Sequence, residues 1–277
     1  MIEQLGRRCA LVILASMTLA VTVGLMAWGP VELTTNAHRY ADERAWLGMA
    51  GAANVWVNAT MFAAGAWGWQ ATRSSHWPLH LRTPWQLFQV CAMVSAGAAA
   101  LYHARPHDSL FVFTHAATAS GFMMLTLGLL AERVHSRFGS LQVCFAVLCG
   151  IALTGGAMLL AQAPGAQLDM RPLLLLEIIP VLVIPAGALS LPGRSTQVSD
   201  WVVVLTFYAL AKLFEAGDAF VLEASGWISG HTLMHLALTA AVGWMAYCAA
   251  LARSATGSVG ERSGAASQRE TSLNTVA

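Results

Sequence analysis

Two histidines near the C-terminus, His231 and His235, have a spacing that suits a shared metal ion. They lie in the stretch SGHTLMH, residues 229–235, which begins an apolar segment without a charged residue as far as residue 250. Residues four apart stand on one face of a helix, so both imidazoles can reach the same partner. Imidazole nitrogen is the commonest metal ligand in proteins, and the pair therefore raises the question of a metal site.

The composition indicates a protein embedded in a membrane. Of the 277 residues, 57% are hydrophobic and only 10% are charged, whereas an ordinary soluble domain is about 25% charged. Apolar runs long enough to cross a bilayer need roughly 20 residues and must be helical to satisfy their backbone. Eight such runs are present, at 9–28, 46–70, 84–102, 110–130, 141–162, 172–191, 201–222 and 228–250. We therefore predict an all-α fold, a polytopic membrane helix bundle.

The first run allows two interpretations. Arg7 and Arg8 precede it as in a signal peptide, but its apolar core of about 20 residues exceeds the roughly 7–15 of a signal sequence, and no small-x-small cleavage site follows. We favour a retained helix. The predicted organisation is then an N-terminal transmembrane helix with an outer loop at 1–36, a membrane domain at 37–252, and a disordered cytoplasmic tail at 253–277 that is rich in Ser, Gly, Ala and Thr.

The distribution of arginines predicts the orientation of the bundle. Positive residues near the ends of spans favour the cytoplasmic side. One side of the predicted membrane carries Arg7, Arg8, Arg73, Arg82, Arg133, Arg137, Arg194, Arg253, Arg262 and Arg269, and the other carries Arg39, Arg44, Arg105 and Arg171. Both termini are therefore predicted to be cytoplasmic. The net charge of +1 gives no sign of a nucleic-acid partner.

This orientation places a third histidine at the level of the first two. The run 84–102 ends at His103 on the outer side, and the run 228–250 begins there with His231 and His235. Three neutral imidazoles and a water form a common ligand set for catalytic zinc. Alternatively, each histidine is an interfacial or hydrogen-bonded residue. Haem binding is a weaker alternative, because a haem held by two histidines needs them on opposite sides of the iron, whereas these three histidines are clustered. Because residue 232 is Thr, the HExxH signature is absent.

The run 201–222 contains the segment KLFEAGD, with Lys212, Glu215 and Asp218 spaced three apart along one helical face. Ionisable groups inside a membrane are costly and are candidates for function. Asp218, nearest the outer end, could accept the second N–H of a metal-bound histidine, while Lys212 and Glu215 neutralise each other. Alternatively, the two form a structural ion pair and Asp218 reaches water. We include Asp218 and Glu215 as candidate residues that orient the metal ligands.

Three segments resemble the successive motifs of a known family of membrane hydrolases. They are RYADERAWLGMAGAANVWVNATMFAAGAWG, ALYHARPHDSLFVFTHAATASGFM and AKLFEAGDAFVLEASGWISGHTLMHLAL. In order and spacing they are similar to the alkaline ceramidase family, over roughly residues 37–250. The resemblance implies a seven-helix ceramidase-like core after one extra N-terminal helix. It also implies zinc held by His103, His231 and His235, and hydrolysis of the amide bond of ceramide, a membrane lipid.

The chain departs from this family at two positions expected to serve catalysis. The resemblance places a serine four residues before the first histidine and an aspartate eleven after it, where this chain has Ala99 and Thr114. Losing a general base typically costs about 10²- to 10⁴-fold in rate, and losing an oxyanion donor about 10²- to 10³-fold. Asp108, in the loop after His103, is the best substitute as a base. Alternatively, it caps the loop or only contributes to the membrane topology. Gly51 occupies the family's acidic calcium position, so we expect no calcium.

Two classes of function follow. One is a zinc hydrolase that cleaves the linear, non-peptide amide bond of a ceramide-type or other lipid, with the base supplied by Asp108 or by water. The other is a catalytically impaired member, a lipid-binding or structural membrane protein whose metal joins helices. A lipid-wide cavity at the histidines favours binding or catalysis, and a filled interior favours the structural role.

Overall fold

The computed structural model describes residues 2–46, 48–162 and 167–274, which form helices and, among the described residues, no strand beyond two isolated bridges. The α-helices are α1 (Ile2–Trp28), α2 (Ala52–Trp56), α3 (Asn58–Arg73), α4 (Leu79–Ala104), α5 (Asp108–Arg133), α6 (Leu141–Ala161), α7 (Arg171–Ser190), α8 (Val198–Ala216), α9 (Asp218–Ser225) and α10 (Gly230–Asn274). Short 3₁₀ helices lie at Thr35–His38 and Ser136–Gly139. The predicted all-α class is confirmed.

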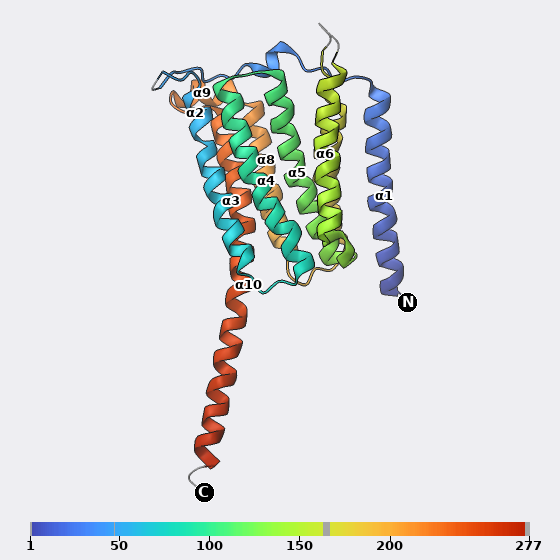
Figure 1. Cartoon of the computed structure of the whole chain (residues 1–277), viewed down its shortest axis with the longest axis vertical. Helices are drawn as coiled ribbons and strands as arrows, with labels where there is room; N and C mark the ends of the chain where they lie inside the picture. The colour runs from blue at the N-terminus through green and yellow to red at the C-terminus, as the bar shows by residue number, and fades with distance from the viewer. Residues whose placement is uncertain (1, 47, 163–166, 275–277) are drawn as a thin grey trace.

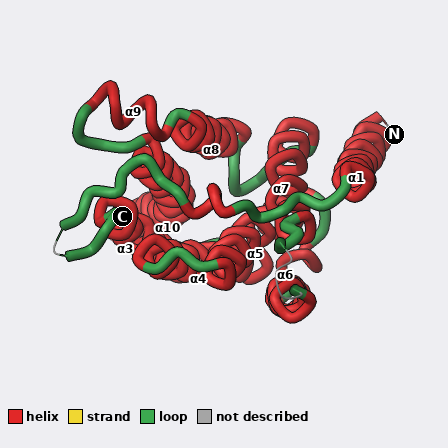
Figure 2. The backbone as a smooth tube through the Cα atoms, turned by 90° about the horizontal axis from the view of Figure 1, so that it is seen from above, coloured by secondary structure: helices red, strands yellow, loops and turns green. Residues whose placement is uncertain are grey.

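The long helices form a closed ring with two helices packed outside it. Around the ring, α3 contacts α4, α4 contacts α5, α5 contacts α7, α7 contacts α8, α8 contacts α10, and α10 contacts α3. Seen from above, these helices surround a common interior, while α1 lies against α7 and α6 against α5 (Figure 2). The contact of α7 with α8 is the least extensive in the ring, so these two helices form its weakest seam.

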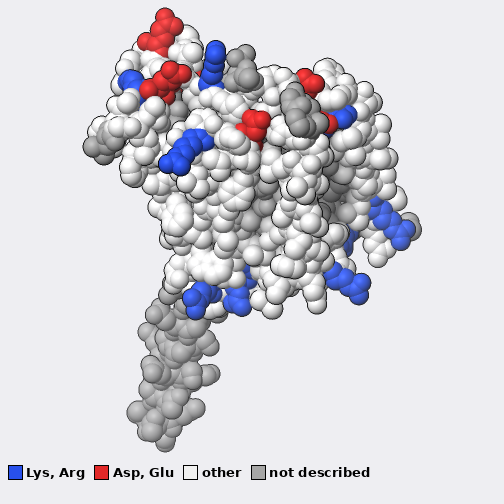
Figure 3. Space-filling model, turned by 45° about the horizontal axis from the view of Figure 1, so that its top comes forward, with Lys and Arg blue, Asp and Glu red and all other residues white. Residues whose placement is uncertain are grey.

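The helices have the length and hydropathy of a membrane protein. Six of them can cross a bilayer by these measures: Gln4–Trp28, Leu79–Ala104, Asp108–Arg133, Leu141–Ala161, Arg171–Ser190 and Gly230–Ala252. Charged side chains gather at the two ends of the face shown in Figure 3, and the band between them is almost free of charge. This distribution is consistent with a membrane-spanning bundle.

Two of the eight predicted spans are not continuous helices. The run 46–70 divides into α2 and the 16-residue α3, where Asn58 donates a side-chain hydrogen bond to the carbonyl of Asn54 at 2.7 Å and competes with the helical backbone pattern. The run 201–222 breaks at Gly217, and α8 carries Asp200, Lys212 and Glu215. The sequence pattern merged these pieces because it measures hydrophobicity and does not detect a change of helix direction.

The direction of the helices brings the ends of α4 and α10 together. Helix α4 ends at Ala104 and α10 begins at Gly230 at the same end of the bundle, drawn at the top of Figure 1. Arg7, in the first turns of α1, bonds the carbonyl of Val134 after α5, and therefore lies at the opposite end. The shared level of the histidines is thus a property of the fold, whereas the side of the membrane stays a prediction.

Helix α10 continues past the lower end of the bundle (Figure 1). The segment 253–277, for which the sequence predicts disorder, begins in this continuation, and its residues 275–277 lie outside the described part of the chain. The disorder of the tail stays a prediction.

Candidate metal centre

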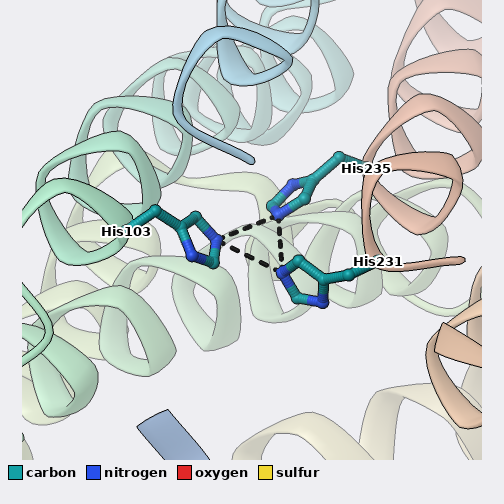
Figure 4. Close-up of side chains that lie close together, drawn as sticks. All are labelled: His103, His231 and His235. Atoms are coloured by element: carbon teal, nitrogen blue, oxygen red, sulfur yellow. Dashed lines mark hydrogen bonds between the residues drawn. The ribbon is translucent and has the colours of Figure 1, made fainter. Parts of the chain in front are cut away.

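Three histidine side chains from two helices point at a common centre. His103 lies in the last turn of α4, and His231 and His235 lie in the first turns of α10 (Figure 4). Their Nε2 atoms are 3.2 Å apart for His103 and His235, 3.3 Å for His231 and His103, and 3.2 Å for His235 and His231. All three side chains are buried, with exposed fractions of 6–8%. We call this group the three-histidine site.

The separations fit a metal ion better than hydrogen bonds alone. Tetrahedral zinc with zinc–nitrogen bonds of about 2.0–2.1 Å places its nitrogen ligands about 3.3–3.4 Å apart. Each imidazole nitrogen offers either one proton or one lone pair in the ring plane, so three nitrogens aimed at one point cannot all be satisfied by one another. The three-histidine site can therefore bind a metal ion.

The start of α10 is held in place by its local sequence. Ser229 precedes the helix and accepts a hydrogen bond from the backbone N–H of Thr232 at 3.1 Å, as a helix N-cap does. Gly230 packs so closely against the α8–α9 junction that a Cβ atom there would lie 2.2 Å from the carbonyl oxygen of Phe214. Only glycine permits this approach, which brings the carboxylate of Asp218 to the backbone of His231.

Asp218 supports the site through backbone groups. Its Oδ1 accepts from the N–H of His231 at 2.7 Å, and its Oδ2 accepts from the N–H of Ala41 at 2.9 Å. The sequence left two roles open for Asp218, a bond to a ring N–H of a ligand or exposure to water, and these backbone bonds are neither. In the described part of the chain, the Nδ1 atoms of His103 and His235 have no hydrogen-bond partner. Packing and the backbone therefore orient these imidazoles, in place of the usual acceptors on the far side of the ring.

Removing the carboxylate of Asp218 tests this support. Asp218→Ala is expected to weaken metal binding roughly 10- to 100-fold, the usual cost of losing a group that orients a metal ligand. Asp218→Asn is the matched variant, because it keeps one oxygen acceptor, and its loss should be smaller. Titration of metal-free protein with zinc against a competing chelator measures both affinities. Equal affinity of Asp218→Ala and the unaltered protein would show that Asp218 does not position His231.

A loop packs over the three-histidine site. Tyr40 packs against His103 and His231, with ring centroids 4.7 and 4.3 Å apart. Burial, followed by a hydrogen bond with Tyr102, raises the pKa of Tyr40, so its hydroxyl keeps its proton at neutral pH. Arg44 fixes the same loop by donating to the carbonyl of Trp227 at 2.7 Å, just before α10. The loop is thus clamped to the helix that carries two of the histidines.

Asp42 makes this clamp sensitive to acid. Hydrogen bonds from the Arg44 guanidinium, at 2.8 and 2.7 Å, hold the pKa of the Asp42 carboxyl below its usual range. A carboxyl whose pKa is lower in the folded state stabilises the fold above its unfolded pKa of about 3.9, and this contribution is lost as pH falls through the folded value. Asp42→Asn should therefore lower the unfolding temperature at pH 7, and the difference from the unaltered protein should shrink below about pH 4. Thermal unfolding between pH 3 and pH 7 measures it, and a constant difference would contradict the assignment.

The remaining predicted site residues lie farther from the three histidines. Glu215 pairs with Lys212, Oε2 to Nζ at 2.6 Å, as the spacing predicted. Asp108 is 43% exposed and its Oδ1 lies 2.9 Å from Nε2 of His38, a partner that the sequence analysis did not consider. The Nδ1 of His38 in turn lies 2.9 Å from the hydroxyl of Tyr102. Asp108 thus ends a chain of polar groups that leads to Tyr102, beside His103.

A cavity opens beside the three-histidine site, inside the ring of helices. Its volume of about 590 Å³ lies within the range of roughly 300–1,000 Å³ that is usual for small-molecule sites. All three histidines lie on its wall. Most of the wall is apolar, with side chains such as Met61, Phe88 and Leu125. The interior of the bundle is therefore open beside the metal centre and could hold part of a lipid.

Ala99 and Thr114, the two positions that depart from the ceramidase pattern, also line this cavity. Ala99 is 5% exposed and offers no polar group. The hydroxyl of Thr114 donates to the carbonyl of Leu110 in its own helix at 2.8 Å. The expected serine and aspartate would face the cavity from these positions, and this chain has apolar or internally bonded groups there.

Three polar side chains near the site were not identified from the sequence: His38, Tyr40 and Glu177. Glu177 pairs with His115, Oε1 to Nδ1 at 2.9 Å, and both line the cavity. A lone glutamate within the predicted span 172–191 was a signal that could have identified it, because charge there is costly. His38 ends a short 3₁₀ helix and Tyr40 lies in the loop after it, where hydrophobic periodicity does not show which way a side chain points.

Comparisons with models of protein families, with curated proteins and with solved structures find no match for this chain. A functional assignment therefore rests on the chemistry of the site.

Proposed function

We propose that this chain is a ceramidase-like membrane zinc hydrolase that cleaves the linear amide bond of a ceramide-type lipid. The observation that carries the proposal is the three-histidine site on the wall of a mostly apolar cavity of about 590 Å³. A metal that served only to join α4 and α10 would not need this open space. The resemblance of the sequence motifs to alkaline ceramidases supplies the reaction, and the cavity supplies room for its lipid substrate.

In the proposed reaction, His103, His231 and His235 hold the zinc through Nε2. Bound zinc supplies a Lewis acid that activates water at neutral pH and polarises a carbonyl oxygen. Hydrolysis adds one water across the amide: the C–N bond breaks, the acyl carbon keeps the hydroxyl oxygen, and the nitrogen takes a proton and leaves as an amine. The apolar cavity wall binds the chains of the lipid and limits water around the amide.

The protein groups beside the site give hydrogen bonds and a route for protons. Tyr40, whose hydroxyl stays protonated, packs on two of the ligands and could turn its hydroxyl from Tyr102 to a developing oxyanion, in place of a serine at position 99. Tyr102, His38 and Asp108 form the hydrogen-bonded chain by which a proton can pass between the cavity and the partly exposed start of α5, where Asp108 lies. In this proposal Asp108 acts through His38.

Replacing Asp108 tests this route. Asp108→Asn keeps the size of the side chain and removes the carboxylate that contacts His38. We expect the rate of amide hydrolysis to fall about 10²-fold, the low end of the cost of losing a base, because the carboxylate acts at a distance. Ser109→Ala, at the next residue, is the control and should keep the rate. Unchanged hydrolysis by Asp108→Asn would exclude Asp108 from proton transfer.

A second candidate function is favoured by one observation. The two positions where a ceramidase is expected to have a serine and an aspartate hold Ala99 and Thr114 in this chain. The three histidines that could bind the metal are all present. This pattern suits a catalytically impaired member, a lipid-binding or structural membrane protein that keeps its metal. The proposed orientation is the same in both cases: several spans cross the membrane, both termini are cytoplasmic, and the three-histidine site faces the outer side.

The two functions are separated by incubating purified, zinc-loaded protein with ceramide and with shorter N-acyl lipids in detergent. A hydrolase releases fatty acid and the long-chain amine in equal amounts, and a chelator stops the release. Binding of the lipids without release of either product, across all acyl amides offered, would reject the hydrolase and favour the lipid-binding protein.

A further inference from the structure

Four polar side chains line the cavity on a different part of its wall from the three-histidine site. His115 on α5 lies 2.9 Å from Glu177 on α7, and Lys212 on α8 lies 2.6 Å from Glu215 on the same helix. Lys212 also interacts electrostatically with Glu177, so the two pairs are connected. All four side chains line the cavity. We call these residues, which come from three helices, the polar cluster.

Structural stabilisation does not account for the Lys212–Glu215 pair. Lys212 and Glu215 have side chains that are 57% and 42% exposed, and an ion pair this exposed contributes little to stability. Ionisable groups are costly in an apolar span unless they face a water-filled cavity or a ligand. Within the described part of the chain, Oε2 of Glu177 and Oε1 of Glu215 have no hydrogen-bond partner, so both carboxylates can accept a further hydrogen bond.

The polar cluster and the three-histidine site line the same cavity of about 590 Å³, so one lipid headgroup could contact both. Glu215 precedes Asp218 by three residues, across the break at Gly217, and Asp218 bonds the backbone of His231. Glu177 lies on α7, across the seam between α7 and α8 where the ring contact is least extensive. A ligand that reaches the metal by this seam would pass the polar cluster.

The chemistry of the polar cluster disfavours an anion and suits a group that both donates and accepts hydrogen bonds. Lys212 and the two glutamates sum to a formal charge of −1, so no excess positive charge is available for a phosphate. Two carboxylates accept hydrogen bonds and an ammonium donates them. A hydroxyl can do both. We infer that the polar cluster binds the hydroxyl groups of an uncharged lipid headgroup while the amide lies at the three-histidine site.

This inference rests on the proposed lipid substrate and narrows it to hydroxylated, unphosphorylated lipids. The alternative is a phosphorylated headgroup, which Arg39 could bind. Arg39 is exposed, lines the same cavity and has no charged partner among the described residues. If Arg39 dominates recognition, a phosphorylated headgroup binds best. If the polar cluster dominates, free hydroxyls bind best.

The inference is tested by measuring how tightly the unaltered protein and its variants bind three lipids that differ in their headgroups. The full-length protein, freed of metal by a chelator so that no lipid is cleaved, is titrated with a long-chain 2-amido-1,3-diol, with the same amide lacking both hydroxyls, and with the 1-phosphate of the diol. We expect the unaltered protein to bind the diol roughly tenfold more tightly than the amide without hydroxyls. The double variant Lys212→Met with Glu215→Met should lose this preference.

Two further variants complete this set of measurements. Glu177→Gln keeps the shape of the side chain, removes its charge, and should reduce the preference for the diol. Ser95→Ala is the matched control, because Ser95 lines the same cavity but bonds Thr118 at 2.9 Å and not the polar cluster. The Ser95→Ala variant should keep the preference for the diol. Thermal unfolding of each variant establishes that it is folded.

The outcomes separate this inference from the hydrolase proposal. A tenfold preference in the unaltered protein that disappears in the double variant supports the inference, even if no lipid is ever cleaved. Equal binding of both amides by the unaltered protein overturns it, even if the zinc-loaded protein hydrolyses ceramide. A preference kept by the double variant, or tighter binding of the 1-phosphate than of the diol, also overturns it.

Discussion

Replacement of His231 by alanine is expected to abolish metal binding at physiological zinc concentrations and, with it, hydrolysis. Three nitrogens at 3.2–3.3 Å from one another provide three of the four positions of a tetrahedral site, and the variant leaves two. The loss of affinity should therefore exceed the roughly 10- to 100-fold that follows from disturbing a group that only orients a ligand. Metal analysis of the purified variant and a fatty-acid release assay measure the two effects.

Thermal unfolding provides the control for this experiment. A ligand that binds only the folded state raises the unfolding temperature with its concentration, so added zinc should stabilise the unaltered protein and leave His231→Ala unchanged. His107→Ala is the matched variant, since His107 is exposed at the same end of the bundle and bonds Ser109. It should keep its metal. If His231→Ala retains zinc and zinc-dependent stabilisation, the three histidines are not the ligands.

Restoring the two missing polar residues is expected to increase the rate of hydrolysis. Ala99 and Thr114 line the cavity that holds the three-histidine site, so Ala99→Ser with Thr114→Asp places a hydroxyl and a carboxylate on its wall. A general base alone contributes about 10²- to 10⁴-fold to a rate and an oxyanion donor about 10²- to 10³-fold. We expect a gain of at least about 10²-fold. Steady-state release of fatty acid from ceramide by zinc-loaded protein measures it.

The matched variant Ala99→Ser with Thr114→Asn keeps the volume of the restored pair and lacks the carboxylate. It should gain far less than the variant with aspartate, because an amide cannot accept a proton from water at neutral pH. No gain in the aspartate variant, with zinc bound and the fold intact, would mean that the cavity has been reshaped for a role other than catalysis. That result would favour the lipid-binding alternative.

The three-histidine site could be predicted from the sequence because short-range rules suffice for it. A spacing of four places His231 and His235 on one helical face. The order of the apolar runs and the arginine distribution then put His103 at the same end of the bundle. Local geometry and helix direction together were enough, and the structure brings all three Nε2 atoms within 3.3 Å.

The polar partners around the site depend on the packing of distant helices and could not be predicted in the same way. His115 and Glu177 are 62 residues apart in the sequence and meet because α5 packs on α7. Asp218 follows the break at Gly217 and its carboxylate accepts from a backbone amide, a partner that a continuous helix did not predict. Hydrophobic periodicity records which face is apolar and contains no information on such tertiary turns.

The central claim is that the three histidines hold a zinc ion with one position open to the cavity. X-ray absorption at the zinc edge of the purified protein tests this claim most directly, because it gives the number and type of ligands. The account predicts one zinc per chain with three imidazole nitrogens at about 2.0–2.1 Å and one light oxygen ligand. Protein without zinc after growth in zinc-replete medium, or zinc closed by four protein ligands, would contradict it.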